Sequence, residues 1–113
     1  MTKPINIYSK FNKFDDYWSP KVISEMNNYQ FKLVKIKGEF IKHNHSDTDE
    51  VFIVIKGSMK IEFDTEIIEI NEGEMIVVPK GANHKPSEIT NFIELKVVGL
   101  LLCTDTVKED SCP

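Results

Sequence analysis

The sequence contains no arginine, so all 14 of its basic side chains are lysines. They are outnumbered by 18 acidic residues, the formal net charge is -4, and no basic stripe is present. Because a nucleic-acid partner requires a clustered positive footprint, we expect no such partner. The lysines in and beside the strand-like segments are expected on a solvated outer face: Lys32, Lys35, Lys37, Lys56 and Lys60.

Long apolar runs are also absent. No segment approaches the roughly 18–20 apolar residues that a membrane span requires, and the N-terminus lacks the apolar core of a signal peptide. These two absences predict a cytoplasmic protein with no membrane partner.

Cysteine is scarce, since only Cys103 and Cys112 are present. Two cysteines do not make a disulfide framework, and their spacing is not that of a CxxC redox pair. Cys103 follows three leucines and is expected to be a small buried or half-buried thiol, whereas Cys112 lies in a polar tail.

The length of 113 residues suits a single domain. We divide the chain into an N-terminal arm over residues 1–20, a barrel over residues 21–100, and a flexible C-terminal tail over residues 101–113.

The arm is expected to contain one short helix over residues 10–18, capped by Ser9. Phe11, Phe14 and Trp18 would then form one apolar stripe, and Pro20 would end the helix region. Such a stripe is typical of packing, either as a lid on the barrel or as a dimer contact. A ligand-binding role for Trp18 is the less favoured alternative.

From residue 21 onward the sequence has the pattern of a β protein. Short apolar or alternating segments are separated by regularly spaced turn signals. This arrangement favours an all-β barrel or sandwich, and the pattern alone does not choose between them. The expected strands cover residues 21–26, 29–37, 39–45, 50–55, 59–64, 66–70, 75–78 and 92–98.

The segment 50–55 is apolar at almost every position, which suits a strand covered on both faces. Val51, Ile53 and Ile55 would point outward toward a second sheet or subunit. A small domain buries a limited share of its own surface. These positions and the aromatic arm together predict a homodimer.

Three histidines carry the main chemical signal. His43 and His45 are two residues apart on an expected strand, so their imidazoles lie on one face, separated by about 6.5 Å along the backbone. Both could reach a single ion at about 2.0–2.1 Å. The same parity includes Ile41, which indicates an inward face.

Two further residues are candidates for the same site. Glu50 opens the next strand and would return beside His45 across a four-residue turn, where a carboxylate on an inward face needs a partner. His84 lies thirty-four residues after Glu50, and its spacing alone does not place it near the others.

Two segments resemble the two motifs of the cupin superfamily. Residues 38–57 contain a Gly, an HxH pair, a Glu and a closing Gly at the spacing of the first motif. Residues 73–84 contain a Gly, five residues, PxG, two residues and a His, as in the second motif. The fifteen residues between them are typical of small microbial cupins, a group often likened to mannose-6-phosphate isomerases.

The resemblance has two departures. The interval from Gly38 to His43 is one residue shorter than usual, and Glu88 stands where the second motif ends in Asn. The second departure leaves open whether a turn-stabilising amide is missing or replaced. Neither departure affects a candidate ligand.

The resemblance implies an all-β double-stranded β-helix, the jelly-roll or cupin barrel, with a short N-terminal helix. It also implies that one divalent transition metal binds to His43, His45, Glu50 and His84. Three imidazoles and a carboxylate suit Fe, Mn, Ni, Co, Cu or Zn, whereas Ca and Mg fit poorly. No residues for another cofactor are identified.

Four protein ligands on a six-coordinate ion leave two positions, which is typical of a working metal. We therefore expect a metal-dependent enzyme, oxygenase- or isomerase-like, acting on an unidentified small molecule, with Glu50 as a weaker candidate base. The alternative is a non-catalytic module that binds or senses a metal or a small ligand. Phosphosugar isomerisation is disfavoured because no phosphate cradle is evident. The side chains expected to line the pocket are Phe31, Ile41, Phe52, Met59 and Phe92.

Overall fold

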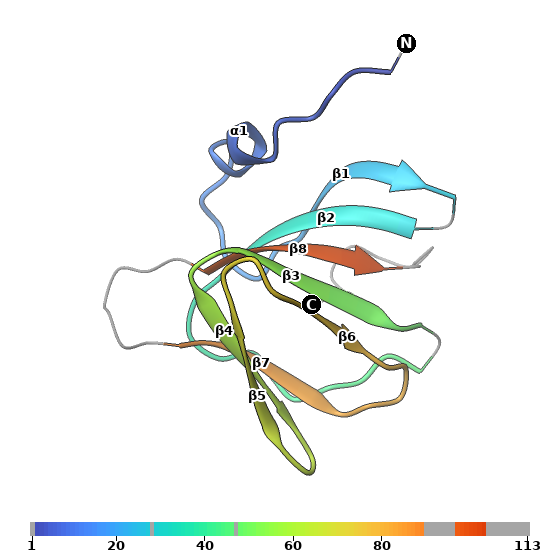
Figure 1. The fold of residues 1–113 in the computed structure, drawn as a ribbon, viewed down its shortest axis with the longest axis vertical. Coiled ribbons are helices and arrows are strands. Elements are labelled where there is room, and N and C mark those ends of the chain that lie inside the picture. Colours follow the sequence, from blue (N-terminus) through green and yellow to red (C-terminus); the bar gives the residue numbers. More distant parts are fainter. Residues whose placement is uncertain (1, 28, 47, 90–96, 104–113) are drawn as a thin grey trace.

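The computed structural model describes residues 2–27, 29–46, 48–89 and, as backbone, 97–103. In these ranges it has one helix and eight strands (Figure 1). They are α1 (Ile7–Phe11), β1 (Lys21–Met26), β2 (Tyr29–Ile36), β3 (Glu50–Lys56), β4 (Ser58–Phe63), β5 (Ile67–Asn71), β6 (Met75–Val78), β7 (His84–Glu88) and β8 (Val97–Cys103).

The strands form two antiparallel sheets that face each other as a jelly-roll barrel. One sheet has five strands in the order β1-β2-β8-β3-β6, and the other has three in the order β5-β4-β7. The sheets lie on opposite sides of the core, which confirms the expected all-β fold (Figure 1). The core residues come from both sheets: Val34, Ile36, Phe52, Val54, Met59, Ile61, Ile70 and Val78.

Alternation along each strand decides which side chains enter this core. On β3, Phe52 and Val54 are buried inside, whereas Val51 and Ile53 lie on the outer face. Fully burying one such side chain contributes roughly 1.5–3 kcal/mol. The same parity rule places Glu50 inside, in front of the apolar part of the strand.

The N-terminal arm lies against the outer face of the five-stranded sheet (Figure 1). The short helix is confirmed, but its expected range of 10–18 is wrong. Asn6 is the cap, because its side chain accepts a hydrogen bond from the Ser9 backbone N–H at 3.0 Å. The helix ends at Phe11, which packs on Leu33. No helix in the described ranges has the length and apolarity needed to cross a membrane.

Two strand predictions need correction. Residues 39–45 do not form a strand and make only isolated bridges, from Glu39 to Ser87 and from His43 to His84. Their partner, β7, was not predicted, because Pro86 argues against a strand; β7 is an edge strand, where proline is tolerated.

The predictions near the C-terminus are tested only in part. The strand described there is β8, which reaches Cys103, three residues beyond the expected end of the barrel. The expected strand over 92–98 lies mostly outside the described residues. So do the tail over 104–113, Phe92, Cys112 and the side chain of Cys103.

The expectation that the strand lysines face solvent is wrong for two of them. Lys32 is 0% exposed and Lys35 is also buried. Both parities of β2 are apolar, because Val34 and Ile36 face the barrel core while Leu33 faces α1. A lysine on either face of this strand is therefore buried.

Candidate metal centre

The segment that carries the first two histidines is held against β7 by its backbone. His43 and His84 exchange two backbone hydrogen bonds, of 3.0 Å from the His43 N–H and 2.8 Å from the His84 N–H. Such a pair places both side chains on the same face of the ladder. The carbonyl of His45 accepts a hydrogen bond of 2.7 Å from the Gly81 N–H, which joins the two motifs a second time.

Hydrogen bonds also orient two of the imidazoles. The Nδ1 atom of His43 lies 2.8 Å from the carbonyl of Ile41, and Nδ1 of His84 lies 2.9 Å from the carbonyl of Ala82. Because a carbonyl can only accept, each Nδ1 carries the proton and each Nε2 keeps its lone pair. This tautomer is the one that binds a metal through Nε2.

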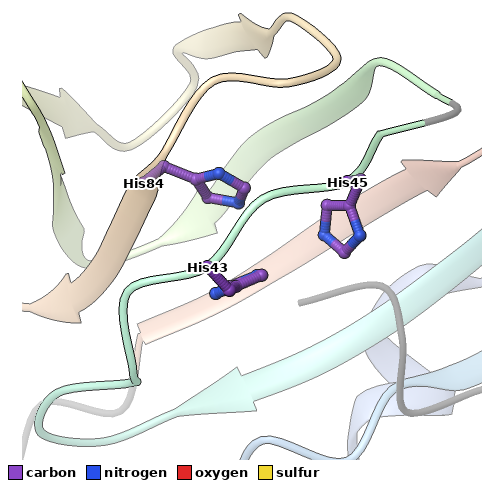
Figure 2. Close-up of side chains that lie close together, drawn as sticks. All are labelled: His43, His45 and His84. Atoms are coloured by element: carbon purple, nitrogen blue, oxygen red, sulfur yellow. The ribbon is translucent and has the colours of Figure 1, made fainter.

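The three histidines meet in one place. Each offers a ligand nitrogen, and these atoms all lie within 4.8 Å of one another. Nitrogens that share one ion at about 2.1 Å lie at most about 4.2 Å apart, so small side-chain movements complete the site. Figure 2 shows the three imidazoles close together, with His43 and His45 carried by the segment before β3 and His84 by the start of β7.

Glu50 lies beside two of these rings at the first position of β3. Its carboxylate Oε1 is 3.3 Å from Nε2 of His84, and Oε2 is 3.7 Å from Nε2 of His45. Its side chain is only 1% exposed. The residues expected as ligands from the sequence are therefore brought together, two from the segment before β3 and one each from β3 and β7.

The polar atoms at the centre of this group lack hydrogen bonds. Nε2 of His45, Nε2 of His84 and both carboxylate oxygens of Glu50 are buried without a partner. Buried polar groups are normally satisfied, and a buried carboxylate without compensation is costly. A divalent cation between these atoms would compensate all four, so the residues present fit the transition metal that the motif resemblance implies.

The electrostatics of the site favour a cation there. Burial by itself lowers the pKa of His84, but the Glu50 carboxylate and the Ala82 carbonyl both favour the charged imidazole and together outweigh burial. The pKa of His84 is therefore raised above its ordinary value. The same negative potential that retains a proton on His84 attracts a metal ion in its place.

Several expected pocket residues are placed differently. Ile41 is 71% exposed, so its predicted inward orientation is wrong, because the segment around it is not a regular strand. Phe31 packs with the outer cluster beneath the arm. Phe52 and Met59 do lie in the inner core, and the Phe52 ring is 6.5 Å from the His84 ring.

The departure at the end of the second motif is compensated. Glu88 donates its backbone N–H to the carbonyl of Gly38 at 2.8 Å, and its Oε2 accepts from the Gly38 N–H at 3.0 Å. The carboxylate therefore makes the turn-stabilising contact that the usual Asn was expected to supply.

The sequence patterns missed two polar residues on the inner face of β2, of which Lys32 is buried and Gln30 is half-buried. Lys32 and Gln30 have the same parity as the core residues Val34 and Ile36. Gln30 also has a buried side-chain oxygen with no hydrogen-bond partner. Their shared parity with these apolar residues was the available signal.

Comparison with known proteins agrees with this geometry. Residues 32–100 match the family model described as Cupin domain, and the chain belongs to the cupin family. It is 29% identical to the uncharacterized protein YdbB of Bacillus subtilis (strain 168), over 99% of this chain and 100% of that protein. It is also 44% identical, over 56% of its length, to 36% of an acireductone dioxygenase from Sulfurihydrogenibium sp. (strain YO3AOP1).

Solved structures with similar folds include two close matches in length. A cupin-2 domain containing protein from Shewanella frigidimarina superposes with a TM-score of 0.80 and 48% identity, over 87% of this chain and 91% of that one. Protein NMB1881 from Neisseria meningitidis gives a TM-score of 0.78 and 31% identity, over 89% and 98% of the two chains.

Proposed function

We propose that this cupin binds one divalent transition metal through His43, His45, Glu50 and His84, and that it uses the metal to transform a small molecule. The observation that carries the proposal is the group of four buried, unpartnered polar atoms on His45, Glu50 and His84.

The side chains have distinct tasks at such a centre. The Ile41 and Ala82 carbonyls keep the His43 and His84 rings in the tautomer that presents Nε2. Glu50, whose side chain is almost fully buried, would neutralise part of the positive charge and is a weaker candidate for a base that accepts a proton at Oε1 or Oε2. The bound metal would supply Lewis acidity or oxygen activation.

An oxygenase-like reaction is favoured over isomerisation. The similarity to an acireductone dioxygenase covers 56% of this chain and 36% of that protein. It therefore supports oxygenase-like chemistry and does not indicate the substrate. The substrate is a small molecule, since the donor atoms are buried and only His43 and His45 are partly exposed.

The metal is tested by elemental analysis of protein purified without chelator or affinity tag. We expect close to one transition-metal ion per chain, and Glu50→Gln and His84→Ala should each lower this content strongly. Glu88→Gln and Pro86→Ala are matched controls, because both positions are buried on β7 outside the candidate centre. Full occupancy in both ligand variants would disprove the four-ligand assignment.

The reaction class is tested on protein of known metal content. Oxygen uptake is measured with catechols, thiols and β-diketones for each of the six candidate metals. Turnover that disappears in His84→Ala and persists in Pro86→Ala supports an oxygenase. Absence of turnover with every metal would favour the non-catalytic binding module.

A further inference from the structure

Trp18 has a backbone conformation that its side chain does not favour. Its φ value is +56°, in the left-handed region, where a bulky residue is strained. Among the described residues, the other non-glycine residue with a positive φ is Asn27, and asparagine tolerates this region. Two hydrogen bonds of 2.8 Å hold Trp18: its N–H donates to the Lys35 carbonyl and its indole Nε1 to the Lys37 carbonyl. The strained conformation is therefore fixed by the end of β2 and the residue just after it.

This conformation marks the place where the N-terminal arm reaches the barrel core. Phe11 and Phe14 of the arm belong to the cluster on the outer face of the five-stranded sheet. Trp18 instead packs against the inner core cluster, which contains Val34 and Ile36. The arm therefore does more than cover the outer face, because its last aromatic ring lies against residues of the barrel core.

A single ring connects Trp18 to a candidate metal ligand. The Trp18 and Phe40 rings are stacked, with centroids 4.9 Å apart and an interplanar angle of 27°. Phe40 in turn lies edge-on to the His43 imidazole, at 5.3 Å and 83°. Both distances lie in the range where aromatic rings attract each other. The Phe40 backbone is itself fixed, because its N–H donates to the Pro86 carbonyl of β7 at 2.9 Å.

His43 needs such support more than His84 does. His84 is fully buried, whereas His43 is half-buried and belongs to a segment that pairs with β7 through isolated bridges. The Ile41 carbonyl sets the tautomer of His43, but Ile41 is itself exposed. Through the Phe40 ring, the His43 imidazole is joined to Trp18 and to the barrel core as well.

We infer that Trp18 is a positioning residue for the metal centre: it holds Phe40, and Phe40 holds the His43 imidazole so that Nε2 faces the other ligands. Metal binding and docking of the arm then stabilise each other, because coupling between two sites is reciprocal. Packing alone explains Phe11 and Phe14, but it does not explain why a strained residue brings an indole to the ring beside His43. This inference rests on the proposed metal site.

The test measures the zinc affinity of the full chain by competition with a coloured chelator. Trp18→Ala should raise the dissociation constant of zinc about tenfold, an effect typical of losing a residue that orients a metal ligand. Trp18→Phe should restore most of the affinity, because a phenyl ring still stacks on Phe40. Phe40→Leu removes both ring contacts while keeping an apolar side chain, and it should weaken zinc binding as Trp18→Ala does.

Phe14→Ala is the matched control, because Phe14 is a partly buried aromatic residue of the same arm that packs on the outer cluster. It should lower the melting temperature and leave the zinc affinity unchanged. The visible spectrum of the cobalt(II)-loaded protein is a second readout, since it reports the geometry of the ligands rather than the stability of the fold. Trp18→Ala should alter this spectrum, whereas Phe14→Ala should not.

The possible failures are distinguishable. Wild-type protein that binds no zinc contradicts the metal site and this inference with it. If the wild type binds zinc and Trp18→Ala keeps both its zinc affinity and its cobalt spectrum, only the positioning role is contradicted. A loss of affinity in Phe14→Ala as large as that in Trp18→Ala would assign the effect to packing of the whole arm and overturn the role of Trp18. If Trp18→Ala does not fold, unchanged zinc affinity in Phe40→Leu overturns the inference.

Discussion

Nε2 of His84 lies 3.3 Å from Oε1 of Glu50, and neither atom makes a properly aligned hydrogen bond. Both side chains are almost fully buried. Two buried polar groups that face each other without a hydrogen bond are destabilising on their own. Their arrangement is therefore suited to a bound cation rather than to the stability of the metal-free fold.

The first prediction is that Glu50→Gln stabilises the metal-free protein. At a pH above the raised pKa of His84, the neutral amide is cheaper to bury than the carboxylate, so the free energy of unfolding should rise by about 1–3 kcal/mol. Urea unfolding of chelator-treated protein measures this change. Glu88→Gln is the control, because Glu88 already has a partner, and equal effects of the two substitutions would contradict the prediction.

The second prediction concerns the pH dependence of metal-free stability. Because the pKa of His84 is raised by Glu50, the folded state binds more protons than the unfolded state in the range above the ordinary histidine value of 6.5. The protonated His84 imidazole therefore stabilises the folded state. This stabilisation is complete below pH 6.5 and is lost as the pH rises through the pKa that His84 has in the folded protein.

Chemical unfolding across this pH range measures the loss. Glu50→Gln removes the carboxylate that raises the pKa, so its stability should vary less with pH over the same interval. Identical pH profiles for the variant and the wild type would show that His84 is not the group responsible.

The sequence patterns correctly predicted those strands that are marked by their own apolar or alternating residues. The bounds of β1 and β6 follow directly from short apolar or alternating runs between turn signals. The segment 39–45 failed because its side chains alternate while its backbone pairs only through His43 and Glu39. Alternation carries no information on hydrogen-bond partners, and without a regular ladder it also misplaced Ile41, which is exposed.

The candidate site was predictable only through motif spacing. The parity of His43 and His45 indicates a shared face, but nothing local brings in His84, which reaches them through the bridge between β7 and the His43 segment. Lys32 was misplaced because lysine is normally exposed. β2 lies between β1 and β8 in the sheet, and the burial of Lys32 depends on these and other distant segments, which the residues near Lys32 do not encode.

The third prediction compares two glycines, Gly81 and Gly73, to distinguish the effect of backbone strain on stability from the effect of a ligand's position on metal binding. Gly81 and Gly73 have φ values of +80° and +82°, with open space where a Cβ would stand. Alanine at either position should cost about 1–2 kcal/mol through backbone strain. The Gly81 N–H donates a hydrogen bond to the carbonyl of His45, whereas the Gly73 N–H donates to the carbonyl of Val54.

Gly81→Ala should therefore weaken zinc binding, measured by calorimetry, as well as lower the melting temperature. Gly73→Ala should lower the melting temperature by a similar amount and leave zinc affinity unchanged. Equal zinc affinities in the two variants would mean that the hydrogen bond to His45 does not position that ligand.

An apolar surface remains on the outer face of the five-stranded sheet. Met75 and Val77 on the edge strand β6 are 59% and 51% exposed, and they pair with Ile53 and Val51 of β3. The arm of the same chain packs near Ile53 but leaves the β6 side uncovered. Exposed apolar side chains on an edge strand are normally protected by a partner.

The fourth prediction is that a second copy of the chain covers this surface. Light scattering after size exclusion should give a dimer for the wild type, and Val77→Lys should convert it to a monomer, because a lysine buried in the contact would be unpaired. Ile67→Lys is the matched control, since Ile67 is also apolar and exposed but lies on β5 of the other sheet. A dimer that survives Val77→Lys and dissociates with Ile67→Lys would place the contact on the three-stranded sheet instead, and a monomeric wild type would exclude the homodimer.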